Sequence, residues 1–183
     1  MPADHPHPAP GPLRLIQSFA STRGTVPDSD VLRTREEAAA WLHKAGLMPP
    51  EAGLTNSEHA ALLRLRDSIR EVLAAHTRGR RDAESAARLT KALADGRLVL
   101  TVDPAGAVQL ASAARASYPH VVATFAVAVA DSATSGTWSR LKACTGPRCG
   151  RAFYDDSPAA DSRRCSTHIA RRLATAVYVK PGL

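Results

Sequence analysis

Apolar side chains recur every three or four residues along one long stretch of the chain, and this period predicts an amphipathic helix. The recurring positions are Leu62, Leu65, Ile69, Val72 and Leu73. Thr55 and Glu58 precede them with the spacing of a capping box, which satisfies the free amide groups at the start of a helix. The pattern therefore predicts a helix that begins after Thr55 and ends near Thr77.

Two shorter stretches also carry helix-start signals. Thr34 and Glu37 form a second capping box, which predicts a helix over residues 35–45 that ends at Gly46. Asp82 can cap another helix. The apolar stripe of that helix consists of Ala86, Leu89 and Leu93.

The remaining patterned segments predict β-structure and one buried helix. Residues 13–19 alternate loosely and predict a first strand. Residues 98–102 and 107–111 flank the turn sequence Asp103-Pro104-Ala105-Gly106 and predict a hairpin. Residues 120–130 are apolar on nearly every face, so we expect them to form a helix at the centre of the core. The expected fold class is α+β, with a mainly helical N-terminal domain and a small β-sheet or hairpin.

Length and composition limit the class of protein. The chain has 183 residues, which suits one domain with a small appendage, and its 44% apolar and 22% charged residues exclude a fibrous or largely disordered chain. Its longest apolar run has about half the length needed to cross a bilayer, and no signal peptide is evident, so we expect a cytoplasmic protein without a membrane partner. Residues 1–12 contain five prolines and no periodicity, and are expected to be a disordered leader.

The positive charge is concentrated near the C-terminus. The formal net charge is +7, yet residues 1–137 contain 15 basic and 14 acidic side chains. Residues 138–183 contain nine basic and three acidic side chains, a balance of +6. This asymmetry indicates a C-terminal module that meets an anionic partner, most commonly nucleic acid, with a merely solvated basic face as the alternative.

Residues 13–137 carry little recognisable chemistry. They contain no phosphate-binding glycine loop, no nucleophile elbow and no pair of histidines at helical metal-binding spacing. An enzyme is therefore the less favoured class.

All three cysteines of the chain lie within 22 residues, in the order Cys144-x4-Cys149-x15-Cys165-x2-His168. An odd number of cysteines without a secretion signal argues against a disulfide framework and favours a metal site or a reactive thiol. Tetrahedral zinc takes four soft or borderline donors, and two short-spaced pairs can supply them. Gly146, between the first two cysteines, favours the tight turn that aims both thiolates at one ion.

Each proposed ligand has a simpler alternative. Cys144 and Cys149 could be reduced thiols, and His168 could be a polar surface residue. Four donors favour a closed, structural Zn²⁺ site, because a catalytic zinc keeps one position open for water. That argument weakens if His168 does not bind.

Two segments of the chain closely resemble the CGNR zinc finger. The first runs from Arg140 to Ser157 and contains Cys144-Thr-Gly-Pro-Arg-Cys149, and the second is Asp161-Ser-Arg-Arg-Cys165-Ser166. In that family the finger follows an N-terminal α/β region called ABATE, found in stress-induced transcription regulators, and the order of elements predicted above is similar to it. The resemblance covers roughly residues 13–178. Residues 131–137 are small and polar and predict a boundary near 137. The predicted division is therefore the disordered leader over 1–12, an ABATE-like domain over 13–137 and a CGNR-like zinc-finger module over 138–183.

The chain departs from that family at the signature itself. Where the family has Cys-Gly-Asn-Arg, this chain has His168-Ile-Ala-Arg171, so the fourth ligand changes from a thiolate to an imidazole. A set of three cysteines and one histidine remains a valid zinc site. Many members also continue into a longer basic tail, which this chain lacks.

The resemblance implies a transcription regulator in which zinc shapes the module and basic residues contact double-stranded DNA. The candidate contacts are Arg163, Arg164, Arg171 and Arg172. Their alternative role is pairing with Asp155, Asp156 and Asp161. Two other function classes remain open: an enzyme or small-molecule-binding protein in which the finger is only a structural staple, and a protein–protein adaptor. A polar pocket between the body and the finger, near Tyr154 and Asp155, would favour the staple. In the regulator hypothesis the N-terminal region would sense a ligand or dimerise. A homodimer is therefore expected in addition to the complex with DNA.

Overall fold

The computed structural model describes residues 8–24 and 29–169. This part of the chain contains five α-helices, one short 3-10 helix and two antiparallel sheets of two strands each. The expected α+β class is confirmed. Among these residues, no helix is both long enough and apolar enough to cross a membrane.

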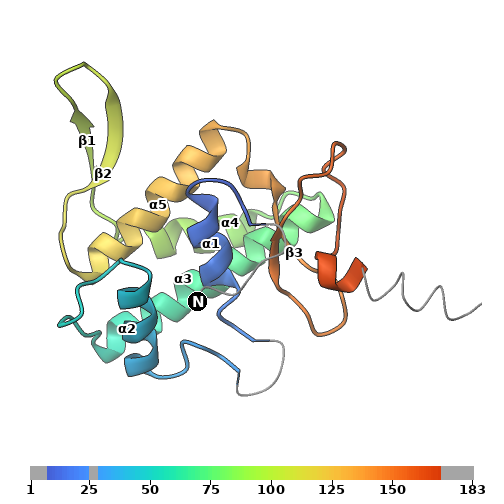
Figure 1. Cartoon of the computed structure of the whole chain (residues 1–183), viewed down its shortest axis with the longest axis horizontal. Helices are drawn as coiled ribbons and strands as arrows, with labels where there is room; N and C mark the ends of the chain where they lie inside the picture. Colours follow the sequence, from blue (N-terminus) through green and yellow to red (C-terminus); the bar gives the residue numbers. More distant parts are fainter. Residues whose placement is uncertain (1–7, 25–28, 170–183) are drawn as a thin grey trace, which may run out of the picture.

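The main apolar core lies among the α-helices of the body. The five helices are α1 (Leu13–Ala20), α2 (Arg35–Lys44), α3 (Asn56–Arg78), α4 (Ala83–Leu93) and α5 (Tyr118–Thr134). Figure 1 shows the long helix α3 running beneath α1 and α5, with α2 and the chain before it at one end. Fully buried side chains from α1, α3 and α5, among them Phe19, Ile69 and Phe125, meet in this core. The rings of Phe19 and Phe125 lie 4.5 Å apart between centroids.

Both predicted capping boxes are present. The hydroxyls of Thr34 and Thr55 accept hydrogen bonds from the amides three residues later, and the side chains of Glu37 and Glu58 accept from the threonine amides. Asp82 caps α4 by accepting from the Ser85 amide. The predicted starts of α2, α3 and α4 are therefore confirmed, because each depends on residues close together in sequence.

The strand predicted over residues 13–19 is wrong, because these residues form helix α1. Its buried positions include Leu13, Ile16, Gln17 and Ala20. They are three or four residues apart, which is the helical period. Gln17 carries the one polar side chain among these positions, and it interrupts the apolar helical period so that the segment resembles a loosely alternating strand.

Other predicted elements differ only in detail. The hairpin is confirmed as β1 (Leu98–Val102) paired with β2 (Val108–Ser112). In α4, Leu89 is buried as expected, but Ala86 is exposed and Ser85 is buried instead. The buried helix predicted over residues 120–130 is present as α5, which continues through Thr134.

The proline-rich segment is described from residue 8 onward. Ala9 is fully buried, and its amide donates to Oε1 of the buried Gln17 at 2.8 Å. Ala9 is therefore fixed against α1, which a mobile leader would not show, whereas residues 8 and 10–12 are exposed. Residues 1–7 of that prediction lie outside the described residues.

The C-terminal module is attached to the end of α3. It begins with the 3-10 turn η1 (Trp138–Arg140) and contains β3 (Leu141–Ala143) paired with β4 (Ala152–Tyr154). His76 Nδ1 lies 2.9 Å from the Leu141 carbonyl oxygen, and Thr77 Oγ1 accepts from the Ala143 amide at 3.0 Å. Leu141 belongs to the main core. These contacts fix β3 against α3, and so they position the module relative to the helical body (Figure 1).

Candidate metal centre and basic surface

The four predicted metal ligands come together in the C-terminal module. The ligand atoms of Cys144, Cys149, Cys165 and His168 all lie within 4.8 Å of one another. Cys149 Sγ is 3.9 Å from Cys165 Sγ, and His168 Nδ1 is 3.7 Å from Cys144 Sγ and 3.5 Å from Cys165 Sγ. Four donors placed tetrahedrally at zinc bond lengths of roughly 2.0–2.3 Å would be about 3.5–3.8 Å apart. The donor set and its spacing therefore fit a single zinc ion.

The first pair of cysteines lies on a tight turn between β3 and β4. The Cys149 amide donates to the Gly146 carbonyl oxygen at 3.0 Å, and the Gly146 amide donates to Cys144 Sγ at 3.3 Å. A Cβ atom on Gly146 would lie 2.5–2.7 Å from three atoms of the His168 ring. Glycine is therefore required at position 146, because the imidazole reaches the cluster across its bare Cα.

The second pair enters on a loop that is tied to the first. Both the amide and the hydroxyl of Thr145 donate to the Arg163 carbonyl oxygen, at 3.0 and 2.9 Å. The Cys165 amide donates to Cys144 Sγ at 3.3 Å. A helical turn follows over residues 166–169, and it places His168 one turn after Cys165. Cys144 Sγ thus accepts hydrogen bonds from two amides, one from each half of the cluster.

The electrostatics of the thiols favour a bound cation. Burial raises the pKa of the Cys149 thiol to about 12. Burial also acts to raise the pKa of Cys165, but hydrogen bonds with His168, Cys144 and Cys149 together outweigh it and lower this pKa to about 7. Because burial disfavours the ionised form of Cys149, a metal that binds here must displace the proton of that thiol.

A buried ion pair holds the loop that carries the second half of the site. Lys142 Nζ lies 2.7 Å from Asp155 Oδ2, and the two side chains are 5% and 1% exposed. The ammonium group also donates to the Ala160 carbonyl oxygen, at 2.5 Å. Asp155 accepts from the Ser157 hydroxyl at 2.6 Å and from the Ser162 amide at 2.9 Å. Every charge in this pair is matched, so the pair fastens residues 155–162 to β3.

The structure divides the basic residues of the module into internal and surface groups. Arg140 donates to the Asp155 and Ser157 carbonyl oxygens, so it has a structural role, as does Lys142. In the sequence both residues contribute only to the C-terminal charge excess. Their role could not be recognised there, because their partners lie 13 or more residues away across a strand pair. The charge available to a partner is correspondingly smaller.

The predicted nucleic-acid contacts are only partly described. Arg163 is exposed and Arg164 is half-buried, and within the described residues neither side chain forms an ion pair. Asp155, one of their proposed alternative partners, is paired with Lys142 instead. Arg171 and Arg172 lie outside the described residues.

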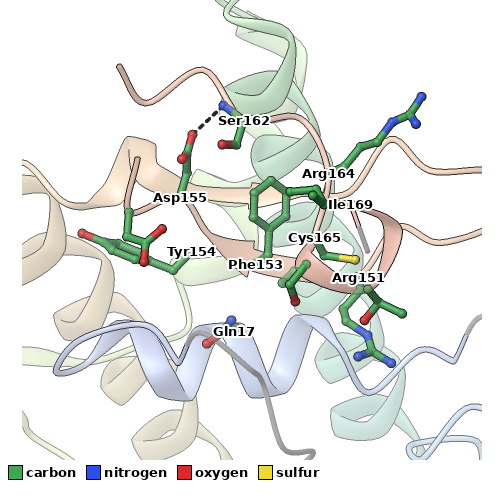
Figure 2. A pocket seen from close by; sticks show the side chains of 13 residues that line it. Gln17, Arg151, Phe153, Tyr154, Asp155, Ser162, Arg164, Cys165 and Ile169 are labelled. Atoms are coloured by element: carbon green, nitrogen blue, oxygen red, sulfur yellow. Dashed lines mark hydrogen bonds between the residues drawn. The ribbon is translucent and has the colours of Figure 1, made fainter. Parts of the chain in front are cut away.

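Two cavities border the module. One, of about 90 Å³, lies between α1 and the finger and includes Gln17, Arg151, Tyr154, Asp155 and Arg164 in its lining. Figure 2 shows the guanidinium groups of Arg151 and Arg164 directed away from each other, so they do not converge on one ligand. This is the location expected for a staple-type binding pocket, but small-molecule sites usually occupy about 300 Å³ or more.

The second cavity, of about 380 Å³, lies between α3 and the first cysteine turn. Arg70 and Arg78 supply charged side chains to its lining, and Cys144, Thr145 and Gly150 supply the finger side. Arg70 is half-buried and donates to the Ala20 carbonyl oxygen at 2.5 Å. Its pKa is lowered by burial and by the nearby Arg23 and Arg66. The lining of this cavity thus contains two arginines and no carboxylate.

Comparison with protein families agrees with both parts of this architecture. The family model described as "Putative stress-induced transcription regulator", ABATE, matches residues 13–136. The model of the CGNR zinc finger matches residues 140–179, which include all four clustered donors. No curated protein matches the chain. Because the first match alone spans more than half of the residues, the chain belongs to the ABATE family, and it carries a CGNR zinc finger after that domain.

Proposed function

We propose that this protein is a zinc-stabilised regulator that binds double-stranded DNA through the basic surface of its finger. The observation that carries the zinc assignment is the convergence of Cys144, Cys149, Cys165 and His168 within 4.8 Å. When bound, a zinc ion would supply charge neutralisation for the thiolates and a four-way cross-link of the module. With no donor position left open, the site supports a structural rather than a catalytic role.

The arrangement around Arg163 and Arg164 supports the DNA-binding part of the proposal. Their main chain is held by Thr145 on one side and by the Cys165–Cys144 contact on the other. Within the described chain no acidic side chain neutralises either guanidinium group. Arginine offers two parallel donors to a phosphate or to a guanine edge. In this proposal the cluster fixes the loop, and the arginines bind the phosphates.

The test is binding of the zinc-loaded protein to labelled genomic duplex fragments across a salt series. We expect Arg163→Ala/Arg164→Ala to weaken binding and to reduce the slope of log K against log salt by about one for each lost phosphate contact. The matched control is Arg33→Ala/Arg35→Ala, which removes the same charge. Those arginines form exposed pairs with Glu37 and Glu36. Equal effects of the two double variants, or no DNA binding near physiological salt, would overturn the proposal.

A second candidate function is recognition of a small anion in the cavity of about 380 Å³. Arg70 and Arg78 line it, and its lining contains no acidic residue. Inorganic phosphate serves as the probe. A saturable rise in melting temperature that Arg78→Gln removes would favour this function, whereas no shift at millimolar phosphate would exclude it. Competition between phosphate and DNA separates the two candidates. Phosphate bound in this cavity does not use Arg163, which the DNA-binding proposal requires.

A further inference from the structure

The β1–β2 hairpin exposes an apolar face that the body does not cover. Six of the large hydrophobic side chains that are exposed in the described chain belong to this hairpin. Figure 1 shows the hairpin projecting from the helical body, at the end of the molecule opposite the finger. An isolated two-stranded hairpin is marginally stable in water, and an exposed apolar sheet face usually marks an interaction site.

Strand pairing shows that the exposed side chains are sorted by face. Leu100 pairs with Leu110, and Val102 pairs with Val108. Residues directly opposite each other share a face of the sheet, and positions two apart along a strand share it as well. One face therefore contains five large apolar side chains that are 39–63% exposed: Leu98, Leu100, Val102, Val108 and Leu110. The other face carries Val99, Thr101, Gln109 and Ala111. We call the first set the hairpin apolar face.

We propose that the hairpin apolar face binds the same face of a second copy of this chain, forming a twofold-symmetric homodimer. The face itself carries no charge, so it offers nothing to select a charged partner. A twofold interface requires a self-complementary surface, and a flat apolar face satisfies that requirement.

The charges at the two ends of the hairpin favour an antiparallel arrangement of the copies. Asp103 is exposed at the tip, whereas Arg97 and Arg115 are exposed at the base. When two hairpins pack face to face in opposite directions, each tip lies near the base of its partner. The carboxylate of one copy then meets the arginines of the other on both sides of the twofold axis. In a parallel arrangement, like charges would be adjacent at each end.

The area of the face is sufficient for such an assembly. Its five side chains expose on the order of 500 Å² in one copy, close to the largest apolar patch of a typical monomer. Two copies would bury about 1,000 Å² in total, which is near the lower limit for a specific interface. We therefore expect a dimer with a dissociation constant in the micromolar range, where concentration controls the assembly.

The experiment measures the mass of the full-length, zinc-loaded protein by sedimentation equilibrium at concentrations from about 1 to 100 μM. We expect the native protein to pass from monomer to dimer across this range. Leu100→Lys places a charge at the centre of the hairpin apolar face and should keep the protein monomeric. Gln109→Lys adds the same charge on the opposite face and serves as the matched control, which should dimerise like the native chain.

The outcomes separate this proposal from its rivals. A native protein that is monomeric at 100 μM would overturn it, as would a Leu100→Lys variant that still dimerises. Because Leu100 and Gln109 are both exposed, neither lysine should change the melting temperature of the monomer at low concentration. Asp103→Asn keeps the side-chain oxygen that accepts from the Ala105 and Ala107 amides, but removes the charge. It should weaken dimerisation several-fold at low salt and have little effect at high salt. Unchanged affinity would exclude the antiparallel arrangement.

Discussion

The helical body and the finger are stabilised by different kinds of interaction, although they share one chain and one junction. The body contains a continuous apolar core, built from α1, α3 and α5 and extended by α2, α4 and the apolar side chains Leu141, Ala143 and Ala152 of β3 and β4. The finger's separate cluster contains only Cys144, Cys149, Phe153 and Cys165. Three of its four members are candidate metal ligands. Apolar burial therefore accounts for the body, whereas the finger depends on groups that are costly to bury without partners.

This difference shows how a segment too small for a core can still have a defined shape. Around the cysteines, amide groups bond to sulfur, and Lys142 with Asp155 fastens the loop between β4 and Cys165. Each of these interactions is directional and requires a specific partner. Loss of one donor should therefore disturb the finger more than loss of one methyl group disturbs the body.

Removing the metal should produce the largest difference in stability between the finger and the body. We expect one zinc per chain in the purified protein, and none in Cys149→Ser. Structural zinc sites contribute about 10 kcal/mol or more to the folding of small modules, so the finger amides should lose protection from hydrogen exchange. Amides in the middle of α3 and α5 should stay protected, because apolar contacts hold them. Native mass spectrometry gives the stoichiometry, and hydrogen exchange gives the location of the change.

The control for that variant is Ala159→Ser, a substitution at an exposed position on the loop of the same module. It should retain zinc and protection. Retention of zinc by Cys149→Ser would refute the four-ligand assignment, and loss of protection throughout α5 would show that the body depends on the finger.

The reverse test makes a cavity in the body. Phe125 is fully buried against Phe19, and Phe125→Ala should reduce the free energy of unfolding by about 3–5 kcal/mol. We expect the variant to keep one zinc per chain, because no ligand contacts Phe125. Urea unfolding gives the stability, and metal analysis gives the content. Phe125→Leu, a smaller change, should also reduce the free energy of unfolding, but by less. Loss of zinc from the folded Phe125→Leu protein would show that the two regions form one cooperative unit.

Sequence alone could identify the features of the body that depend on neighbouring residues. The capping boxes at Thr34 and Thr55, the cap at Asp82 and the turn at Asp103 each involve residues two to four apart, and all are present. Helix α1 was mistaken for a strand, because its one buried polar residue, Gln17, interrupts the apolar period. The partner that makes this burial acceptable is the Ala9 amide, in a segment that looked like a disordered leader.

The candidate metal site was predictable for the same reason, and the parts around it were not. The spacing of the cysteine pairs is local, whereas Lys142 and Asp155 are 13 residues apart and meet only once β3 pairs with β4. Charge counting includes Lys142 in the C-terminal excess without distinguishing it from surface residues, since sequence shows the sign of a charge and not its burial. Likewise, the approach of His168 to Gly146 depends on how two loops cross.

Breaking the buried ion pair tests whether polar contacts determine the shape of the finger. Lys142→Met removes the ammonium group and leaves Asp155 buried, and we expect a loss of about 3 kcal/mol in unfolding free energy. The cost should lie near the lower end for such pairs, because the carboxylate keeps donors from Ser157 and Ser162. The exposed pair between Arg88 and Glu71 provides the comparison, and Arg88→Met should cost much less, because solvent screens exposed pairs. Equal costs, measured by urea unfolding, would contradict this account of the finger.

Gly146→Ala tests how closely the two halves of the metal site approach each other. The added Cβ would meet the His168 ring at 2.5–2.7 Å, so the imidazole must move away from the cysteines. We expect zinc affinity to fall by about 10–100-fold, as for other changes that misplace a ligand, with little change in the stability of the body. Gly53→Ala is the control, since its Cβ would have no neighbour within 4 Å. Competition with a chromophoric chelator measures both affinities, and unchanged binding by Gly146→Ala would indicate that His168 is not a ligand.

The smallest expected effect lies at the junction between the body and the finger, where His76 of α3 bonds to the Leu141 carbonyl oxygen. Burial lowers the pKa of His76 below its usual 6.5, so the folded protein holds the imidazole neutral while the unfolded chain takes up a proton. The folded state should therefore lose stability as pH falls below 6.5, by at most about 1.4 kcal/mol per pH unit for this group, until the lowered pKa is reached. His76→Asn keeps a donor near the position of Nδ1 but cannot titrate. The difference in unfolding free energy between the native protein and this variant, measured from pH 7.5 to 5.5, removes the contribution of His168, which both proteins share. We expect the native protein to lose stability relative to His76→Asn as the pH falls. If the difference in unfolding free energy did not change with pH, the junction would admit enough water to ionise His76 in the folded protein.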